Sequence, residues 1–259
     1  MRSNSLALRL VLSLLVVLLG SGSSFGQTHR ILFVGNSYTF YNSMPRIFQA
    51  MAESRFPDQQ FETKFVGGGG ATLEKHWEVG QALREIQTGQ WDYVVLQEQS
   101  TLGSKNLSDK NSWKQFNKYS RMFAEEVKKS GAETIFFMTW SRRDSRDQQE
   151  YLTTAYTNIA NELNCKLAQV GTVWDSLRET ETIDLYNEDG SHPSVEGSYL
   201  VALTLLSTIF EIQPQDTPGS LSGYKILRGG AIAKVESNLC DFPIATVQAI
   251  EKAVNYQYN

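Results

Sequence analysis

Asp189 and His192 lie three residues apart in the segment Asp-Gly-Ser-His, and Pro193 follows directly. An imidazole changes charge near neutral pH, and a carboxylate beside it determines which ring nitrogen carries the proton. The spacing therefore predicts a catalytic pair with His192 as general base. Pro193 favours the first turn of a helix, which would place His192 at the N-cap, where the helix dipole favours the neutral ring. A capping histidine beside a turn is the structural alternative.

A candidate nucleophile, Ser37, follows Gly35 and Asn36 in the segment GNSYTFYNS, directly after an apolar run. A serine at such a strand-to-helix turn is exposed at the edge of a sheet, where open α/β proteins bind their ligands. Glycine, asparagine and serine are also ordinary turn and capping residues. Taken alone, the segment therefore leaves nucleophile and helix cap as alternatives.

Two further segments could hold a negatively charged oxygen. The glycines at 67–70 can direct backbone N–H groups at an anion ahead of a helix, and the alternative is a flexible turn with Thr72 as the cap. Gln97 and Gln99 are alternate residues at the end of another apolar run, so their side chains can point the same way. They could equally be solvated loop residues.

These residues need a scaffold, and the order of apolar segments predicts one. Five runs rich in β-branched and aromatic residues read as strands buried on both faces: 30–35, 61–67, 92–97, 134–140 and 166–171. Helical spacing predicts helices between and after them: 44–54, 72–87, 112–129, 148–163, a short one at 172–180, a long apolar one from Pro193 and a last one at 244–256.

The alternation of strands and helices predicts an α/β fold with a parallel sheet of about five strands. In a doubly wound sheet, functional residues lie at the carboxyl ends of the strands. Ser37, the glycines, the glutamines and the Asp-His pair all follow predicted strands, so we expect them at one edge. We predict a single domain over 27–259, without an assignment for the stretch near Gly229 and Gly230.

The first 26 residues predict a secretory signal peptide. Arg2 and Arg9 flank the start of a short apolar run, and Ser24 and Gly26 suit cleavage before Gln27. An uncleaved anchor is the alternative, although the run is short for a bilayer. We expect an exported, periplasmic or extracellular, protein with no stable membrane anchor after cleavage. The mature chain keeps 22 Lys and Arg against 28 Asp and Glu, a net charge of −6, which argues against nucleic-acid binding.

The remaining histidines and cysteines carry weaker signals. His29 lies at the entry of the first strand and His76 on a helix, and no two histidines have zinc-ligand spacing, so we predict no metal and no cofactor. Cys165 and Cys240 are the only cysteines. An exported protein can form a disulfide between them, and free thiols are the alternative.

The segments GNS at 35–37 and DGSH at 189–192 resemble the SGNH hydrolases, a subgroup of the GDSL esterases and lipases. The resemblance implies a three-layer α/β/α, flavodoxin-like fold with Ser37 as nucleophile, His192 as base and acid, and Asp189 orienting it. It also implies an oxyanion hole formed by the N–H groups of Ser37 and Gly70 and by an amide side chain.

The family's asparagine block, Gly-x-Asn-Asp, is absent. The segment LQEQS is similar to the Gln-Gly-Glu block of carbohydrate O-acetylesterases, which makes Gln97 the amide donor and Gln99 the alternate. Asn36 replaces the family's aspartate, and we expect it to brace the turn. Asn36 and Tyr38 are also expected to line the substrate pocket.

We therefore expect a secreted serine esterase that removes small acyl groups, such as acetyl, from a small-molecule or glycan ester. Two other functions stay open. An inert carbohydrate-binding domain could use the aromatic side chains Tyr38, Phe40 and Tyr41. A flavodoxin-like flavin or phosphate binder could use the hydroxyls of Ser37, Thr39 and Ser43.

Overall fold

The computed structural model describes residues 26–104, 109–180, 182–227 and 229–258. All but the last residue of the predicted signal peptide lies outside this range. Within it, five strands form one parallel sheet in the order β2-β1-β3-β4-β5. The strands are β1 (Thr28–Gly35), β2 (Gln60–Gly67), β3 (Tyr93–Leu96), β4 (Glu133–Phe137) and β5 (Lys166–Ala168). Each matches a predicted strand.

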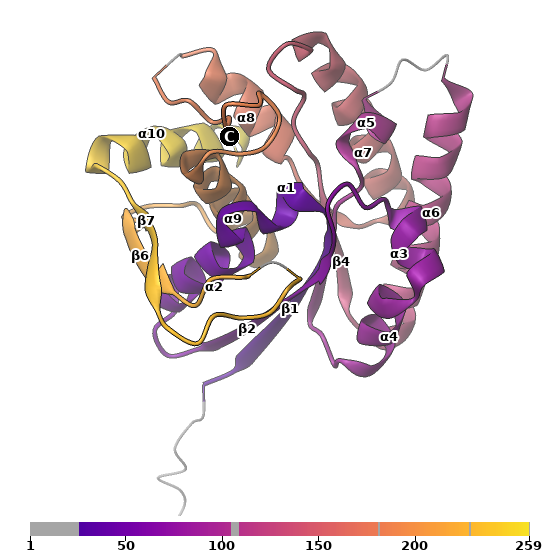
Figure 1. Ribbon diagram of the computed structural model, residues 1–259, viewed down its shortest axis with the longest axis horizontal. Helices are drawn as coiled ribbons and strands as arrows, with labels where there is room; N and C mark the ends of the chain where they lie inside the picture. The colour runs from indigo at the N-terminus through magenta and orange to yellow at the C-terminus, as the bar shows by residue number, and fades with distance from the viewer. Residues whose placement is uncertain (1–25, 105–108, 181, 228, 259) are drawn as a thin grey trace, which may run out of the picture.

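Helices cover both faces of the sheet, so the predicted three-layer α/β/α architecture is confirmed (Figure 1). Alternate side chains of β1 face opposite layers: Ile31 and Phe33 belong to one hydrophobic core, whereas Leu32 and Val34 belong to the other. Because both faces are buried, the strands need apolar residues at nearly every position.

The helices are α1 (Ser37–Phe40), α2 (Met44–Arg55), α3 (Leu73–Val79), α4 (Gln81–Thr88), α5 (Ser100–Gly103), α6 (Lys110–Ser130), α7 (Gln149–Leu163), α8 (Val170–Arg178), α9 (Val195–Phe210) and α10 (Ile244–Asn255), with 3-10 turns η1 (Tyr41–Ser43), η2 (Arg146–Gln148) and η3 (Tyr256–Tyr258). The predicted helices lie close to their expected positions, and the short helices α1 and α5 were not predicted.

One predicted helix is divided in two. The segment 72–87 forms α3 and α4, because Gly80 between them has a φ of 74°, a left-handed conformation that ends α3. The helical spacing of the apolar residues continues through this break. Periodicity alone therefore did not reveal the break, although the glycine is a signal for it.

The unassigned stretch near Gly229 and Gly230 belongs to an antiparallel hairpin outside the main sheet. Its strands are β6 (Ser220–Gly223) and β7 (Ser237–Asp241), and they pack against α2 (Figure 1). The backbone N–H of Ile226, in the connection between the strands, donates to Ser43 Oγ over 2.9 Å. The hairpin thus reaches the segment that follows Ser37.

Both cysteines are free thiols in this structure. Cys240 belongs to the core on the α9 side of the sheet, and Cys165 packs against the core on the opposite side. The sheet therefore separates them, and the open question of a disulfide is answered by their positions. His29 is buried and its ring stacks on Phe61 with the centroids 5.2 Å apart.

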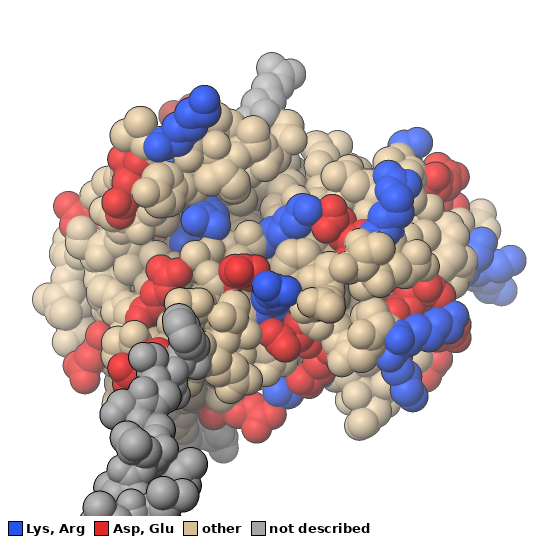
Figure 2. Space-filling model, turned by 90° about the horizontal axis from the view of Figure 1, so that it is seen from below, with Lys and Arg blue, Asp and Glu red and all other residues tan. Residues whose placement is uncertain are grey.

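On the face seen from below, Lys and Arg side chains alternate with Asp and Glu (Figure 2). None of the helices in the described ranges is both long enough and apolar enough to cross a bilayer.

Candidate active site

Ser37, His192 and Asp189 form a continuous line of hydrogen bonds. His192 Nε2 lies 2.9 Å from Ser37 Oγ, and His192 Nδ1 lies 2.5 Å from Asp189 Oδ2. The structure thus brings together two residues separated by 155 positions in the chain. His192 and Asp189 remain partly open to solvent, with side-chain exposures of 28% and 46%. The histidine can accept the serine proton only on Nε2, since Nδ1 faces the carboxylate.

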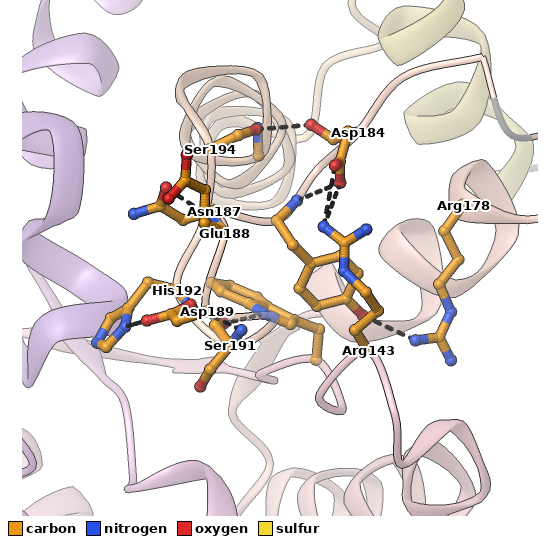
Figure 3. Close-up of polar contacts among 12 residues, drawn as sticks. Arg143, Arg178, Asp184, Asn187, Glu188, Asp189, Ser191, His192 and Ser194 are labelled. Carbon is orange, nitrogen blue, oxygen red and sulfur yellow. Dashed lines mark hydrogen bonds and ion pairs between the residues drawn. The ribbon is translucent and has the colours of Figure 1, made fainter.

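Asp189 is held by the tight loop that carries it. Its Oδ1 accepts the backbone N–H groups of Ser191 and His192, each over 2.9 Å. Gly190 permits the turn, because its φ is +65°. Figure 3 shows the Asp189 side chain directed at the His192 ring. Desolvation opposes ionisation of Asp189, but the bonds from His192 and from these backbone groups outweigh it and lower its pKa to about 2. Asp189 is therefore a carboxylate at neutral pH.

The nucleophile candidate stands at the first position of α1, directly after β1. Asn36 caps this helix, because its Oδ1 accepts the N–H of Tyr38 over 3.0 Å. Gly35 has no space for a side chain: a Cβ there would lie 2.4 Å from Thr39 Oγ1 and 2.6 Å from Gln97 Oε1. The glycine and the asparagine of the GNS segment therefore shape a close turn that presents Ser37 at the sheet edge.

His192 is not the N-cap of the following helix, so that prediction is wrong. Ser194 caps α9, with its hydroxyl accepting the N–H of Gly197 over 3.0 Å. Pro193 instead pairs with Tyr186 in an antiparallel bridge, and Asn187 N–H donates to the His192 carbonyl over 2.8 Å. These contacts hold the chain extended up to Ser194. His192 therefore does not occupy the position at which the dipole of α9 would favour a neutral imidazole.

Asn36 and Tyr38 do not line an open pocket, which contradicts their predicted role. They are only 3% and 5% exposed. Asn36 Nδ2 donates to the carbonyl of Ala71 over 3.0 Å, so its side chain joins the turn to the glycine loop. The Tyr38 hydroxyl lies 2.7 Å from Ser191 Oγ. Asn36 thus braces the turn as expected, and Tyr38 supports the loop that carries Asp189.

Gln97 is also buried inside the protein, with no exposed surface. Its Oε1 accepts the N–H of Asn36 and the hydroxyl of Thr39, both over 2.9 Å. Its Nε2 donates to the Glu98 carbonyl over 2.6 Å. Both ends of the amide are therefore occupied by the scaffold, and the structure contradicts Gln97 as a donor to substrate.

Gln99, the alternate donor, keeps a free amide nitrogen. Its Oε1 accepts both the N–H and the hydroxyl of Thr101 over 2.6 Å, which orients the amide group. No acceptor for its Nε2 is found among the described residues. Gln99 is partly exposed at the carboxyl end of β3, the same edge of the sheet as Ser37.

Two backbone N–H groups at this edge are likewise without acceptors in the described part of the chain: those of Ser37 and Gly70. Gly70 is exposed and has a φ of +66°, and a Cβ there would meet no atom within 4 Å. Its φ, and not a lack of space, is thus what favours glycine at this position.

The hydroxyls considered for a phosphate site are mostly unavailable. Thr39 is fully buried and donates to Gln97, and Ser43 is 5% exposed and accepts from Ile226. Only Ser37 of the three faces the sheet edge. The geometry thus gives little support to a flavodoxin-like phosphate binder.

An aromatic stack supports the Asp-His loop, and the sequence reasoning did not identify it. The ring of Tyr38 stacks on Trp140 with centroids 4.5 Å apart, and Trp140 stacks on Trp174 at 4.0 Å. Trp140 Nε1 donates to the Ser191 carbonyl over 3.1 Å. The stack therefore connects the turn after β1 with the loop of Asp189. The sequence shows only scattered aromatic residues here.

Asn42 is a second residue that was missed. Its Nδ2 donates to the carbonyls of Pro193 and Ser194, over 3.1 and 2.8 Å, and to Ser198 Oγ over 2.9 Å. Asn42 has a φ of 52°, a conformation that asparagine tolerates better than most residues. It ties the segment after Ser37 to the start of α9.

The chain resembles known proteins in its three-dimensional structure. No protein-family model and no curated sequence matches the chain. A putative SGNH hydrolase from Slackia heliotrinireducens superposes with a TM-score of 0.57 at 26% identity, over 71% of this chain and 100% of its own. Axe2, an acetylxylan esterase from Geobacillus stearothermophilus, gives 0.56 at 17% identity, over 71% and 95%. LAE5, an alpha/beta hydrolase enzyme from the metagenome of Lake Arreo, gives 0.56 at 14%, over 71% and 96%.

Proposed function

We propose that this protein, whose fold is that of the SGNH hydrolases, is a serine hydrolase that cleaves carboxylic esters through an acyl-serine intermediate. The single observation that carries the proposal is the hydrogen-bonded line from Ser37 Oγ through His192 to Asp189. This arrangement can activate a hydroxyl for attack, because the base contacts the nucleophile and a carboxylate orients the base.

In the first step, His192 Nε2 takes the proton of Ser37 as Oγ attacks the ester carbonyl carbon. The tetrahedral intermediate then collapses, and His192 returns that proton to the leaving alcohol oxygen. In the second step, His192 removes a proton from water, which attacks the acyl-serine. His192 then returns this proton to Ser37 Oγ as the acid is released. Asp189 accepts the hydrogen bond from Nδ1–H throughout and stabilises the transient imidazolium.

The oxyanion of each intermediate needs hydrogen-bond donors. We assign this role to the backbone N–H groups of Ser37 and Gly70 and to the side-chain amide of Gln99. All three lie at the carboxyl edge of the sheet, and none has an acceptor among the described residues. Donors at such positions typically contribute 10²–10³-fold each to the rate.

A cavity beside the catalytic line is the proposed place for part of the substrate. It has a volume of about 380 Å³ and lies between Phe40 and Tyr41 on one side and Lys225 and Leu239 of the hairpin segment on the other. Tyr41 also stacks on the His192 ring, with centroids 4.6 Å apart. Partly exposed aromatic rings next to the base suit a sugar or another flat, weakly polar group.

We propose small acyl groups, such as acetyl, on a carbohydrate as the substrate class. The support is the segment LQEQS, the aromatic cavity and the likeness to Axe2, which is itself an acetylxylan esterase. Nitrophenyl esters of increasing chain length, followed by acetylated sugars, test this preference. Faster turnover of long-chain esters than of acetate would contradict it.

Labelling with a fluorophosphonate tests the proposed chemistry itself. We expect the purified protein to be labelled at Ser37, and Ser37→Ala to lose both labelling and nitrophenyl acetate turnover. Ser176→Ala is a suitable control, because Ser176 is an exposed serine on α8. Folded protein that resists the reagent would count against a serine hydrolase.

A further inference from the structure

Glu98 is a buried carboxyl group that the proposed chemistry does not use. It lies two positions after Leu96, the last residue of β3, and is only 1% exposed. Its Oε1 accepts two backbone N–H groups, from Leu73 over 3.0 Å and from Gln99 over 2.6 Å. Leu73 is the first residue of α3 and Gln99 lies between β3 and α5, so one carboxylate oxygen joins two segments that are distant in the sequence.

Both of these segments carry proposed oxyanion donors. Leu73 is the first residue of α3 and lies three positions after Gly70. Gln99 supplies the free amide nitrogen described above. The glycine loop has one other side-chain tether nearby, from Asn36 Nδ2 to the Ala71 carbonyl, and this tether leads to Ser37. Glu98 is therefore the direct link between the glycine loop and Gln99.

Burying an acid between two segments costs free energy, because the carboxyl group loses its hydration. Glu98 Oε2 is buried without a hydrogen-bond partner among the described residues. The nearby titratable groups are Glu74 on α3, which is acidic, and the hydroxyl of Tyr156 on α7, which contacts the backbone N–H of Glu98 at 3.2 Å. Neither is a cation that could balance an ionised carboxylate. Desolvation accordingly raises the pKa of Glu98 to about 7.

We propose that Glu98 is a positioning residue that sets the glycine loop and Gln99 at the mutual distance required to bind one oxyanion. The proposal rests on the esterase function above. Glu98 itself does not touch the substrate, and it acts through the two N–H groups that share its Oε1. Since errors of about 1 Å in such sites can reduce rates roughly 100-fold, the link matters for turnover more than for binding.

Two substitutions of similar size separate the hydrogen bonds from the volume. Glu98→Gln keeps a side-chain oxygen that can accept from Leu73 and Gln99, whereas Glu98→Met fills the space without an acceptor. We expect Glu98→Met to lower kcat for nitrophenyl acetate about 10- to 100-fold with KM changed less than about threefold. Glu98→Gln should stay within about fivefold of the wild type at pH 6.

Val127→Ala is the matched control for a loss of stability, since Val127 is a fully buried residue of the same core near the far end of α6. We expect it to lower the melting temperature and leave kcat unchanged. Unchanged kcat in folded Glu98→Met would overturn the proposal. So would an equal loss in Glu98→Gln and Glu98→Met, because the shared acceptor would then not be the cause.

Amide hydrogen exchange gives a second reading that does not depend on esterase activity. The N–H groups of Leu73 and Gln99 should lose protection in Glu98→Met and keep it in Glu98→Gln, with Val127→Ala like the wild type at both. If the wild type neither reacts with fluorophosphonate nor turns over esters, the esterase function fails while the exchange data still decide whether Glu98 links the loops. Full protection in Glu98→Met overturns the link in either case.

Discussion

Among single residues, Asp189 has the most direct influence on His192. It receives two backbone N–H groups and faces Nδ1 of the ring, so it determines both the orientation and the tautomer of the base. Its pKa of about 2 means that it stays ionised through the mildly acidic range. Loss of activity on moderate acidification therefore cannot come from protonation of this carboxylate.

Replacement of Asp189 by asparagine should reduce kcat about 10³- to 10⁴-fold, because the amide no longer favours the productive tautomer or stabilises the imidazolium. Steady-state kinetics with nitrophenyl acetate measure the effect. Glu188→Gln is the control, since this neighbouring acid is exposed and takes no part in the line of hydrogen bonds. Equal activity of the two variants would contradict the role of Asp189.

The raised pKa of Glu98 predicts that the free energy of unfolding depends on pH. Its pKa is raised by burial from 4.5 to about 7, so the folded state holds its proton more tightly than the unfolded state. Folding is therefore favoured most below about pH 4.5, and this contribution is lost as the pH rises towards 7. The full difference is at most roughly 3 kcal/mol.

Urea unfolding at pH 5 and pH 7.5 can isolate this contribution. The free energy of unfolding of the wild type should fall between the two pH values by more than that of Glu98→Gln, which has no proton to lose. Parallel pH dependence in both proteins would show that Glu98 does not titrate in this range.

At the scale of elements, the position of Asp189 and His192 depends on how closely α9 packs against the loop before it and against Trp174. Gly197 lies in the first turn of α9, against the loop that leads to Asp189. A Cβ at this position would be 2.3 Å from the Leu185 carbonyl oxygen and 2.6 Å from the Trp174 ring. Trp174 is part of the aromatic stack under the loop that carries Asp189. A shift of the Trp174 ring would therefore also move this loop.

Gly197→Ala should therefore lower the free energy of unfolding by about 1–3 kcal/mol, since overpacking a close contact forces the backbone or the ring to move. Chemical denaturation measures the change. Gly68→Ala provides the comparison, because a Cβ there meets no atom within 4 Å. Equal stability of the two variants would mean that α9 can shift without strain.

For the whole molecule, the fold shared with the solved structures does not account for the full length of this chain. The solved structures are matched over 95–100% of their own lengths but over only 71% of this chain. The hairpin segment contributes Lys225 and Leu239 to the cavity beside Tyr41. We infer that the edge of the main sheet carries the chemistry and that the hairpin segment, through its side chains in this cavity, helps to select the substrate.

Export is also a property of the whole chain. We propose that cleavage between Gly26 and Gln27 releases the mature protein, because Arg2, Arg9 and an apolar run precede this point and β1 begins at Thr28. Intact-mass measurement of protein recovered from the periplasm or medium of an expressing bacterium should give a chain that starts at Gln27. Recovery of the full-length chain in the membrane fraction would support an uncleaved anchor.

Much of the scaffold could be predicted from the sequence because it depends on local patterns. Continuous apolar runs marked the five buried strands, and helical spacing marked the main helices. The order of these elements then placed Ser37 and His192 at one edge of a parallel sheet. The spacing of Asp189 and His192 indicated a catalytic pair, and the resemblance to SGNH hydrolases assigned the roles of Ser37, His192 and Asp189. The hydrogen bonds in the structure agree with these roles.

Only the tertiary structure decided which polar side chains face the site and which brace it. Gln97 and Gln99 are equivalent by pattern, yet Gln97 bonds to residues about 60 positions away, whereas the Gln99 amide nitrogen has no acceptor in the part of the chain that the structure describes. Glu98 likewise shows its role only through Leu73. Local sequence sets the propensity for strand, helix and turn, whereas the partners of a buried polar group come from segments that folding brings together.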